Sequence, residues 1–201
     1  MPRRNEGRGS KLLYFVTGNR GKFIEAEDIL RQFGFRLRQE DLELDEPQSD
    51  SLEYVAKRTA LSAFEALKRP LFLEDAGLFI DTLNGFPGVF SSYVYSSIGV
   101  EGILRLMRDV GERRARFKSC VAFVSSAIYP KPKLFMGEVE GHISRSAKGE
   151  QGFGFDPIFV PSGFSKTFAQ MSTSQKNRLS HRSKAIRAIG SFLSRNPSLL
   201  G

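Results

Sequence analysis

Apolar residues in the first third of the chain alternate between short continuous runs and repeats at helical spacing. Residues 12–16 are continuously apolar, which predicts a buried strand, and the next apolar positions recur every three or four residues, which predicts a helix that Gly34 ends. Residues 35–44 alternate well enough for a second strand. After a polar stretch, Asp50 and Glu53 form a capping-box-like start to a helix with a long apolar face. The pattern therefore predicts strand, helix, strand and helix in that order.

The rest of the chain continues this interleaving of helices and strands. The further predicted elements are a short strand over 70–73, a helix over 100–110, an antiparallel hairpin of strands over 116–126 and 134–143, a short strand over 157–160 and a last helix capped by Ser180. Interleaved elements of both kinds predict an α/β fold with a mixed sheet flanked by helices.

Length and composition predict one folded domain. The chain has 201 residues, of which 40% are hydrophobic, enough to bury a sizeable core. We expect residues 1–10 to form a disordered tail and residues 11–201 to form the domain. No apolar stretch approaches the roughly 20 residues that span a bilayer, and the first ten residues lack the apolar segment of a secretory signal. We therefore expect a cytoplasmic protein with no membrane partner. The single cysteine, Cys120, excludes an internal disulfide and is expected to be a small buried residue rather than a nucleophile.

The net charge of +8 fits a polyanionic partner, which could be nucleic acid, a membrane surface or a small molecule. The densest basic cluster consists of Arg113, Arg114, Arg116 and Lys118. From Arg114 onward these residues alternate with apolar ones, as the solvent face of a strand does. The chain has no zinc-finger spacing and no clear interleaving of aromatic and basic residues. We therefore expect no stable complex with nucleic acid.

The segment TGNRGK, from Thr17 to Lys22, lies where the first strand passes into the first helix. Unpaired backbone N–H groups and the positive end of the helix dipole point at whatever lies above such a turn, so an anion would be stabilised there. Lys22 can reach back to a phosphate, and Thr17 and Asn19 offer side-chain hydrogen bonds. The spacing is not that of a Walker A loop. On this segment alone, an ordinary capped turn with a surface lysine is an equally good interpretation.

Glu74 and Asp75 are the last residues of the short strand that begins over 70–73. Neighbouring side chains of a strand point to opposite faces, so only one of the two is expected to face a given site. Carboxylates at a strand end near a phosphate-binding turn are ligands that Mg²⁺ prefers, and Glu46 could add a second one. From spacing alone, a solvated Glu46 in an acidic stretch is the better interpretation.

The segment from Gly152 to Arg182 carries glycines, aromatic residues and both charges. Its glycines let backbone approach a ligand, and Phe153 and Phe155 offer flat faces to a base, although both could be core residues. Asp156 precedes a proline, which favours an extended backbone. The remaining candidates are Lys176, for phosphate, and His181 with Arg182, which begin the last helix.

Five ordered motifs resemble the inosine triphosphate pyrophosphatase family, which hydrolyses non-standard purine nucleoside triphosphates to the monophosphate and pyrophosphate. They are TGNRGK, LDEPQ at 44–48, FLEDAGL before NGFPGVF, GFGFDPIF, and QKNRLSHR. The resemblance covers nearly the whole chain. It implies an elongated, two-lobed domain with a cleft between the lobes, a substrate such as ITP, dITP or XTP, a Mg²⁺ cofactor and a homodimer. The aromatic stretch over 86–95 could serve as the contact surface of the dimer or belong to the core.

The resemblance also implies a role for each motif residue. Phosphate binding falls to Thr17, Gly18, Asn19, Arg20, Gly21, Lys22, Ala76 and Lys176. Metal binding falls to Glu46 and Asp75, and Asp75 would also accept the proton of the attacking water. Base binding falls to Phe153, Gly154, Phe155, Asp156, His181 and Arg182.

The chain departs from the family pattern at several positions. Ala76 stands where members usually have a hydroxyl residue, Thr59 stands where a lysine often contributes, and Gln170 and Gln175 replace frequent glutamates. Two alternatives stay open. A Maf-like pyrophosphatase of modified pyrimidine nucleotides fits TGNRGK and the carboxylates but not GFGFDP or SHR. A non-enzymatic basic domain that binds nucleotides or nucleic acid would have no need of carboxylates in a phosphate site.

Overall fold

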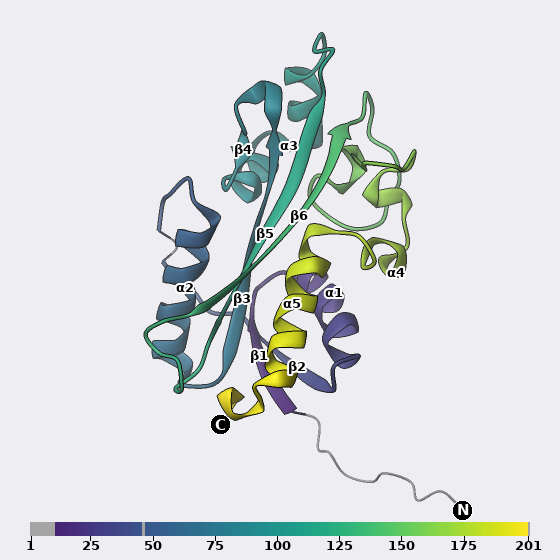
Figure 1. Cartoon of the computed structure of the whole chain (residues 1–201). Coiled ribbons are helices and arrows are strands. Elements are labelled where there is room, and N and C mark those ends of the chain that lie inside the picture. Colours follow the sequence, from purple (N-terminus) through teal and green to yellow (C-terminus); the bar gives the residue numbers. More distant parts are fainter. Residues whose placement is uncertain (1–10, 46, 201) are drawn as a thin grey trace, which may run out of the picture.

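A seven-stranded mixed sheet runs the length of the protein and carries helices on both faces (Figure 1). The computed structural model describes residues 11–45 and 47–200, so the predicted tail at residues 1–10 lies outside the described range. The strands are β1 Lys11–Val16, β2 Phe35–Glu40, β3 Leu71–Ile80, β4 Pro87–Gly88, β5 Arg114–Val124, β6 Lys133–Ile143 and β7 Phe159–Pro161. The α-helices are α1 Arg20–Arg31, α2 Leu52–Leu67, α3 Ser91–Leu106, α4 Thr173–Lys176 and α5 His181–Arg195. The predicted α/β class with a mixed, helix-flanked sheet is confirmed.

The strand order is β2-β1-β3-β5-β6-β7, with β4 paired to β3 outside this path. β1 is parallel to both of its neighbours, while β3, β5, β6 and β7 pair antiparallel. Along one edge of β3, β1 pairs with Leu71 to Leu73 and β4 pairs with Leu78 and Phe79. Among the described strands, none pairs with residues 74–77 along that edge. The sheet therefore has a gap between β1 and β4, along the middle of one edge of β3.

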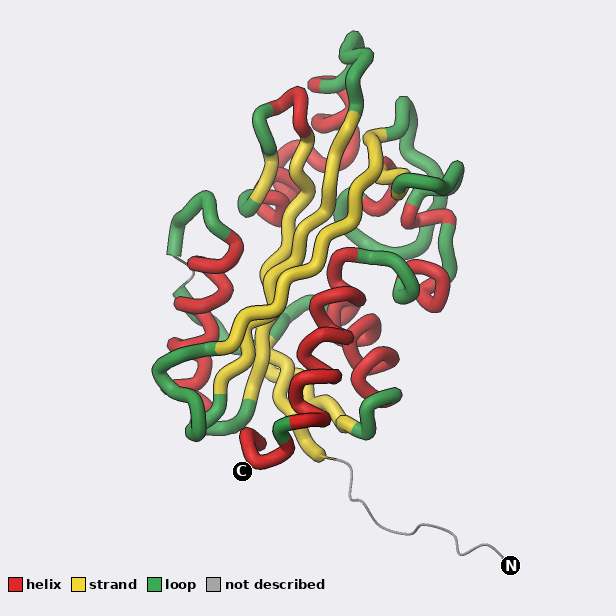
Figure 2. Tube along the Cα trace, viewed as in Figure 1, coloured by secondary structure: helices red, strands yellow, loops and turns green. Residues whose placement is uncertain are grey.

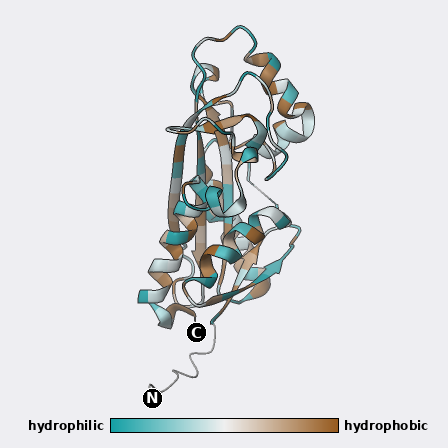
Figure 3. Cartoon of the chain, turned by 90° about the vertical axis from the view of Figure 1, so that its right-hand side faces the viewer, coloured by the Kyte–Doolittle hydropathy of each residue, from teal (hydrophilic) through white to brown (hydrophobic). Residues whose placement is uncertain are grey.

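Helices α1 and α5 cover one face of the lower sheet, and α2 covers the other (Figures 1 and 2). Phe15 and Phe72 stack at 4.3 Å between ring centroids in the core beneath α1 and α5. A second core lies under α2, and a third fills the upper lobe around Phe117 and Phe159. Polar and apolar positions alternate along the helices that cover the sheet (Figure 3), as expected for helices with one buried face. The elongated two-lobed shape is thus held by separate cores above and below the gap.

Several predicted boundaries were wrong. β3 continues to Ile80 instead of ending with Glu74 and Asp75, because β5 pairs with it over the whole length of the strand. The cap of α2 is Ser51 rather than Asp50, since the Ser51 hydroxyl accepts the N–H of Tyr54 at 3.2 Å. The second strand ends at Glu40 rather than at residue 44.

The helix predicted over 100–110 begins earlier, at Ser91, and ends at Leu106. Gly99, with φ of 63° and ψ of −165°, interrupts it and separates a first segment of eight residues, 91–98, from a second. Glycine adopts this backbone without strain, which an L side chain would not. None of the helices within 11–45 and 47–200 combines the length and apolar character needed to cross a bilayer.

Candidate active site

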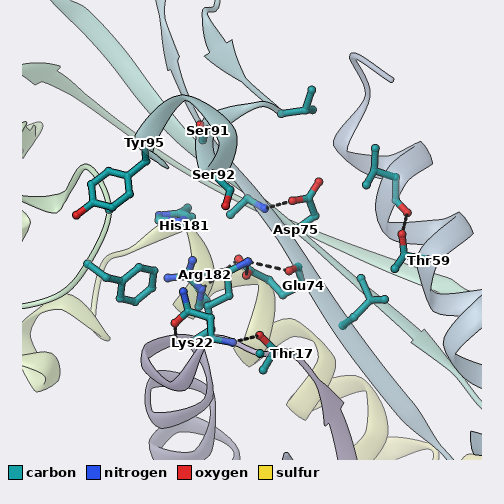
Figure 4. Close-up of a pocket in the computed structure, with 18 of the residues that line it drawn as sticks. Thr17, Lys22, Thr59, Glu74, Asp75, Ser91, Ser92, Tyr95, His181 and Arg182 are labelled. Atoms are coloured by element: carbon teal, nitrogen blue, oxygen red, sulfur yellow. Dashed lines mark hydrogen bonds and ion pairs between the residues drawn. The ribbon is translucent and has the colours of Figure 1, made fainter. Parts of the chain in front are cut away.

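A cavity of about 520 Å³ occupies the gap in the sheet. Its walls come from the end of β1, the first turns of α1, α3 and α5, the middle of β3 and the loop around residue 154. In Figure 4, Tyr95 stands on one side of the cavity and Asp75 on the other, with His181 and Arg182 between them. Ligands of open α/β sheets bind where strand order changes beyond the strand ends, and this cavity lies at such a point.

Both carboxylates of β3 line this cavity, contrary to the prediction that only one would face the site. Their side chains do leave opposite faces of the strand: Glu74 points toward Ser119 and α5, and Asp75 points toward the α2 side. Because the cavity sits at an open sheet edge, it reaches around β3 to both faces. Both faces of β3 therefore line the cavity, and each face contributes one carboxylate in different surroundings.

The turn between β1 and α1 is built by its own side chains. Asn19 caps α1, and its Oδ1 accepts the N–H of Lys22 at 3.0 Å. The Thr17 hydroxyl accepts the N–H of Asn19 at 3.1 Å. Thr17, Gly18, Asn19 and Lys22 line the cavity, whereas Arg20 donates to Gln39 at 3.2 Å. The predicted strand, turn and helix are confirmed.

Gly21 brings this turn against the loop of the distant GFGFDP motif. A Cβ added at Gly21 would lie 2.6 Å from Cδ1 of the Phe153 ring. Only glycine leaves room for the ring to rest on the first turn of α1. The two motifs, far apart in the sequence, thus touch through this one position.

A network of buried charges underlies the α5 side of the cavity. Lys22 Nζ lies 3.0 Å from Glu74 Oε2 and also donates to the Glu74 carbonyl at 3.0 Å. Glu74 Oε1 accepts the Ser119 hydroxyl at 2.6 Å and lies 3.1 Å from Nε of Arg182. Burial alone would raise the pKa of the Glu74 carboxyl, but Arg182 and Lys22 outweigh it and hold that pKa well below its usual range.

Glu25 extends the network from α1. Its two oxygens lie 2.7 Å from Arg182 Nη1 and 2.8 Å from Lys176 Nζ. Lys176 in turn lies 2.5 Å from Asp156 Oδ2. Burial favours the neutral form of Arg182, but Glu74 and Glu25 raise its pKa above the ordinary value, so it stays charged. Three acidic and three basic side chains, all joined by ion pairs, thus meet beneath one wall of the cavity.

Lys176 is almost completely buried, at 3% exposure, and it is not a lining residue in this structure. Its ammonium lies 4.8 Å from the centre of the Phe153 ring, directly behind the loop. A phosphate role for Lys176 stays a prediction, and it would require the ammonium to leave Glu25 or Asp156.

The loop that carries Phe153 is shaped by positive φ angles at Gly152 (77°) and Gly154 (61°). Asp156 Oδ2 accepts the N–H of Phe153 at 2.9 Å, which fixes the start of the loop. Asp156 begins a short 3₁₀ helix instead of adopting the expected extended backbone. Burial raises its pKa, and Lys176 only partly offsets this. Phe155 is buried in the upper core and also lines the cavity, so its base-binding role stays a prediction.

His181 lines the cavity while its ring stacks on Phe117, with centroids 4.6 Å apart and planes 11° apart. Burial lowers the pKa of the imidazole well below its ordinary value, and the neighbouring Arg182 acts in the same direction. The ring is therefore neutral. Its Nδ1 is buried and has no hydrogen-bond partner in the described part of the chain. Such an orphaned atom is costly unless a ligand or water meets it.

The α2 side of the cavity is less polar. Its apolar lining consists of Leu42, Leu44, Val55 and Leu73. Thr59 also lines it, but its hydroxyl donates to the Val55 carbonyl at 2.9 Å. Asp75 is the carboxylate of this side, and its Oδ1 accepts the N–H of Ala76 at 2.9 Å. Glu46, the other predicted metal ligand, lies outside the described residues.

The carboxylate on the α2 side of the cavity fits one mode of magnesium binding. Within the described ranges, no group of three or more His, Cys, Asp or Glu side chains could form a metal cage. Mg²⁺ commonly binds through one or two carboxylates together with substrate phosphates, and keeps several waters. Asp75 at the cavity wall suits that mode.

Sequence reasoning missed Glu25 and the α3 wall of the cavity. Glu25 precedes Ile29 by four residues and so lies on the apolar stripe of α1, where a carboxylate needs a buried partner. The missed α3 residues are Ser91, Ser92 and Tyr95, which share one helix face at spacings of three and four. Glu25 lies within the first helix, which was predicted correctly, so its pattern could have been noticed, whereas the α3 residues lie outside the helix predicted over 100–110.

The open-edged mixed sheet, the capped turn and the cleft of basic and aromatic side chains define an α/β protein of the nucleotide-binding kind. More specifically, the chain belongs to the Ham1 family, whose sequence profile matches residues 13–192. This confirms the resemblance seen in the motifs.

Individual relatives agree with this assignment. The chain is 48% identical over 189 residues to a dITP/XTP pyrophosphatase of Ignicoccus hospitalis, covering 92% of this chain and 98% of the relative. It is 44% identical over 184 residues to a protein of the same name from Hyperthermus butylicus, covering 92% and 95%. Among solved structures, the Ham1 protein of Staphylococcus aureus superposes with a TM-score of 0.79 at 29% identity, covering 92% of this chain and 100% of that one.

Proposed function

We propose that this protein hydrolyses non-canonical purine nucleoside triphosphates, such as dITP, ITP and XTP, to the monophosphate and pyrophosphate. The observation that carries the proposal is one cavity with a capped helix turn at one wall and a charged Arg182 beside a neutral His181 at another. The names of the relatives support the same activity.

The phosphates are assigned to the turn at the start of α1. Its N–H groups and the helix dipole favour an anion, and Lys22 adds a point charge. Because Lys22 is paired with Glu74 in this structure, it is held at the wall instead of ranging through solvent. The N–H of Ala76, also a candidate for the phosphates, would have to leave Asp75 Oδ1, which accepts it at 2.9 Å, and Lys176 is the candidate for a further phosphate contact. Substrate phosphates would compete with Glu74 for Lys22.

We assign the reaction to the Asp75 end. Mg²⁺ bound to Asp75 and Glu46 would supply neutralisation of charge on the phosphate oxygens. The Asp75 carboxylate, held by the N–H of Ala76, would orient a water toward the α-phosphorus and accept its proton. Cleavage of the bond between the α-phosphorus and the bridging oxygen would release pyrophosphate.

Base selection is assigned to the pair that begins α5. Arg182 is a donor, which suits the 6-oxo oxygen of hypoxanthine or xanthine, whereas the 6-amino group of adenine would face it donor to donor. Leaving such donors unpaired costs about 1–3 kcal/mol. Neutral His181 can act as donor or acceptor through Nδ1, depending on its tautomer. Phe153, lying on Gly21 and over Arg182 at 5.1 Å from the ring centre, is placed to stack on the base.

We also propose that two copies associate through the aromatic stretch over 86–95. Phe86, Phe90 and Tyr93 are 40%, 48% and 73% exposed, more than apolar side chains of a closed core would be. The proposed substrates are cytoplasmic metabolites, so we propose the cytoplasm as the place of action.

The test is pyrophosphate release from ITP, XTP, dITP, GTP and ATP, each with Mg²⁺ and with the metal chelated. We expect ITP, dITP and XTP to exceed ATP by about 10-fold or more, the factor that roughly 1.4 kcal/mol supplies. Equal rates on ITP and ATP would contradict the base selection. Unchanged rates after chelation would contradict the metal.

A further inference from the structure

One face of α3 forms a cavity wall that no predicted motif includes. Ser91, Ser92 and Tyr95 all line the cavity. Their spacing places them on one side of the first segment of α3, which ends before Gly99. Figure 4 shows Ser92 between Tyr95 and Asp75, so this face extends from the Tyr95 end of the cavity toward Asp75.

The start of α3 is fixed to the sheet. Ser91 is buried, and its hydroxyl accepts the N–H of Leu78 at 2.8 Å and donates to the Gly88 carbonyl at 2.7 Å. Val94, on the same turn, is buried in the upper core. Tyr95, four residues after Ser91, is therefore carried by an anchored turn rather than by a loose loop.

Tyr95 lies at the end of the cavity assigned to the base. Its ring meets the buried Phe155 edge to face, with centroids 5.5 Å apart and planes 88° apart. This contact leaves Tyr95 44% exposed although it lines a cavity. An aromatic ring that is supported on one side and open on another offers a surface to a flat ligand.

We propose that Tyr95 contacts the nucleobase and adds binding energy for every purine without selecting among them. This inference rests on the proposed function. Aromatic contact with a base is tolerant of base identity, because every base has an apolar face. Selection would then belong to Arg182 and His181, while Tyr95 would act on affinity alone.

The experiment compares Tyr95→Ala with Tyr95→Phe and with Tyr54→Ala. Loss of the ring should raise KM for ITP, XTP and GTP by a common factor of about 10, in the range of one base–aromatic contact, and leave kcat within about 3-fold. Tyr95→Phe keeps the ring and should keep KM within about 2-fold for both ITP and dITP. Tyr54 on α2 is 49% exposed, is not a lining residue and lies outside the proposed contact between copies, so Tyr54→Ala should leave KM unchanged.

Inorganic tripolyphosphate separates the two ends of the site. Its inhibition constant should be the same for the wild type and for Tyr95→Ala, because it has no base. An unchanged KM in Tyr95→Ala would overturn the inference. So would an equal loss of tripolyphosphate affinity, or a KM effect confined to one purine.

Failure of the proposed function would look different. If the wild type released no pyrophosphate from any purine nucleotide, the function would fall. Calorimetric titration with ITP and IMP would still test Tyr95, with weaker binding of both to Tyr95→Ala expected and equal binding overturning the inference.

Discussion

The charged side chains on the two faces of β3 have different surroundings at the cavity. On the α5 side, three acids and three bases pair with one another beneath the wall, and most of these side chains are nearly fully buried. On the α2 side, Asp75 shares the wall with aliphatic side chains and with Thr59. The α5 side is therefore assembled before any ligand arrives, since each guanidinium and ammonium already has a fixed partner. The α2 side is suited to charges that arrive with the substrate.

The comparison also shows that the net charge of the chain does not by itself explain how the cavity would attract a polyphosphate. The chain carries +8, yet the cations closest to the cavity are neutralised by neighbouring carboxylates. Attraction of a polyphosphate must then come from the helix turn, from the exchange of Lys22 between Glu74 and the ligand and, in the proposed mechanism, from Mg²⁺. Positive charge elsewhere on the surface contributes to long-range attraction and is screened beyond about 8 Å at physiological salt.

The strongest test removes the charge on the α2 side. Asp75→Asn is nearly isosteric, and we expect it to lower kcat at least about 100-fold, because a positioned base contributes a factor of that order. Unfolding in urea should remain close to that of the wild type. Near-full turnover by this variant would remove Asp75 from the proposed mechanism.

Glu74→Gln is the matched change on the opposite face of the same strand. It leaves Lys22 and Arg182 short of a counter-charge, and breaking a buried pair in this way costs about 3–5 kcal/mol of unfolding free energy. The measurement is the urea midpoint and slope at pH 7. A variant as stable as the wild type would show that the buried network does not stabilise the fold through this carboxylate.

The smallest expected effect is the pH dependence of stability. Glu74 and Glu25 have pKa values lowered in the folded state, so their contribution is present above their unfolded pKa of about 4.3 and is lost as pH falls through the folded values. The lowered pKa of His181 acts in the same direction, beginning below its unfolded value of about 6.5. Asp156 opposes this trend, because its pKa is raised.

We therefore expect the unfolding free energy to decrease as pH falls from 7 to 3, and to decrease less in Glu74→Gln below about pH 4.3. Urea titrations at several pH values check this. Parallel curves for the two proteins would contradict the assigned role of Glu74.

Much of the fold could be predicted from the sequence, because the residue patterns that predict it are local. The turn at Asn19, the cap at Ser180 and the hairpin of β5 and β6 each follow from a few neighbouring residues. The length of β3 could not be predicted, because its second half is held by pairing with β5, some 35 to 43 residues away along the chain. Hydrophobic pattern alone does not reveal such long-range pairing.

The candidate active site shows the same difference between local patterns and long-range pairing. Motif residues around Thr17, Phe153 and His181 do meet at one cavity, as the resemblance implied. The partners that hold Arg182 and Lys176 were missed, because the pairing of Glu25 with residues over 150 positions later exists only in the folded chain. A local pattern can mark a charge as buried without naming what neutralises it.

The gap in the sheet also bears on how this protein avoids edge-to-edge aggregation of its sheet. An unpaired strand edge is a template on which another chain can add. Here side chains occupy the open stretch of β3: Lys22 donates to the carbonyl of Glu74, and Asp75 accepts the N–H of Ala76. Just beyond that stretch, where β4 begins to pair, the Ser91 hydroxyl accepts the N–H of Leu78. The same contacts that shape the cavity thereby keep the edge from recruiting a foreign strand, so substitutions at Lys22 or Ser91 should be watched for aggregation as well as for lost activity.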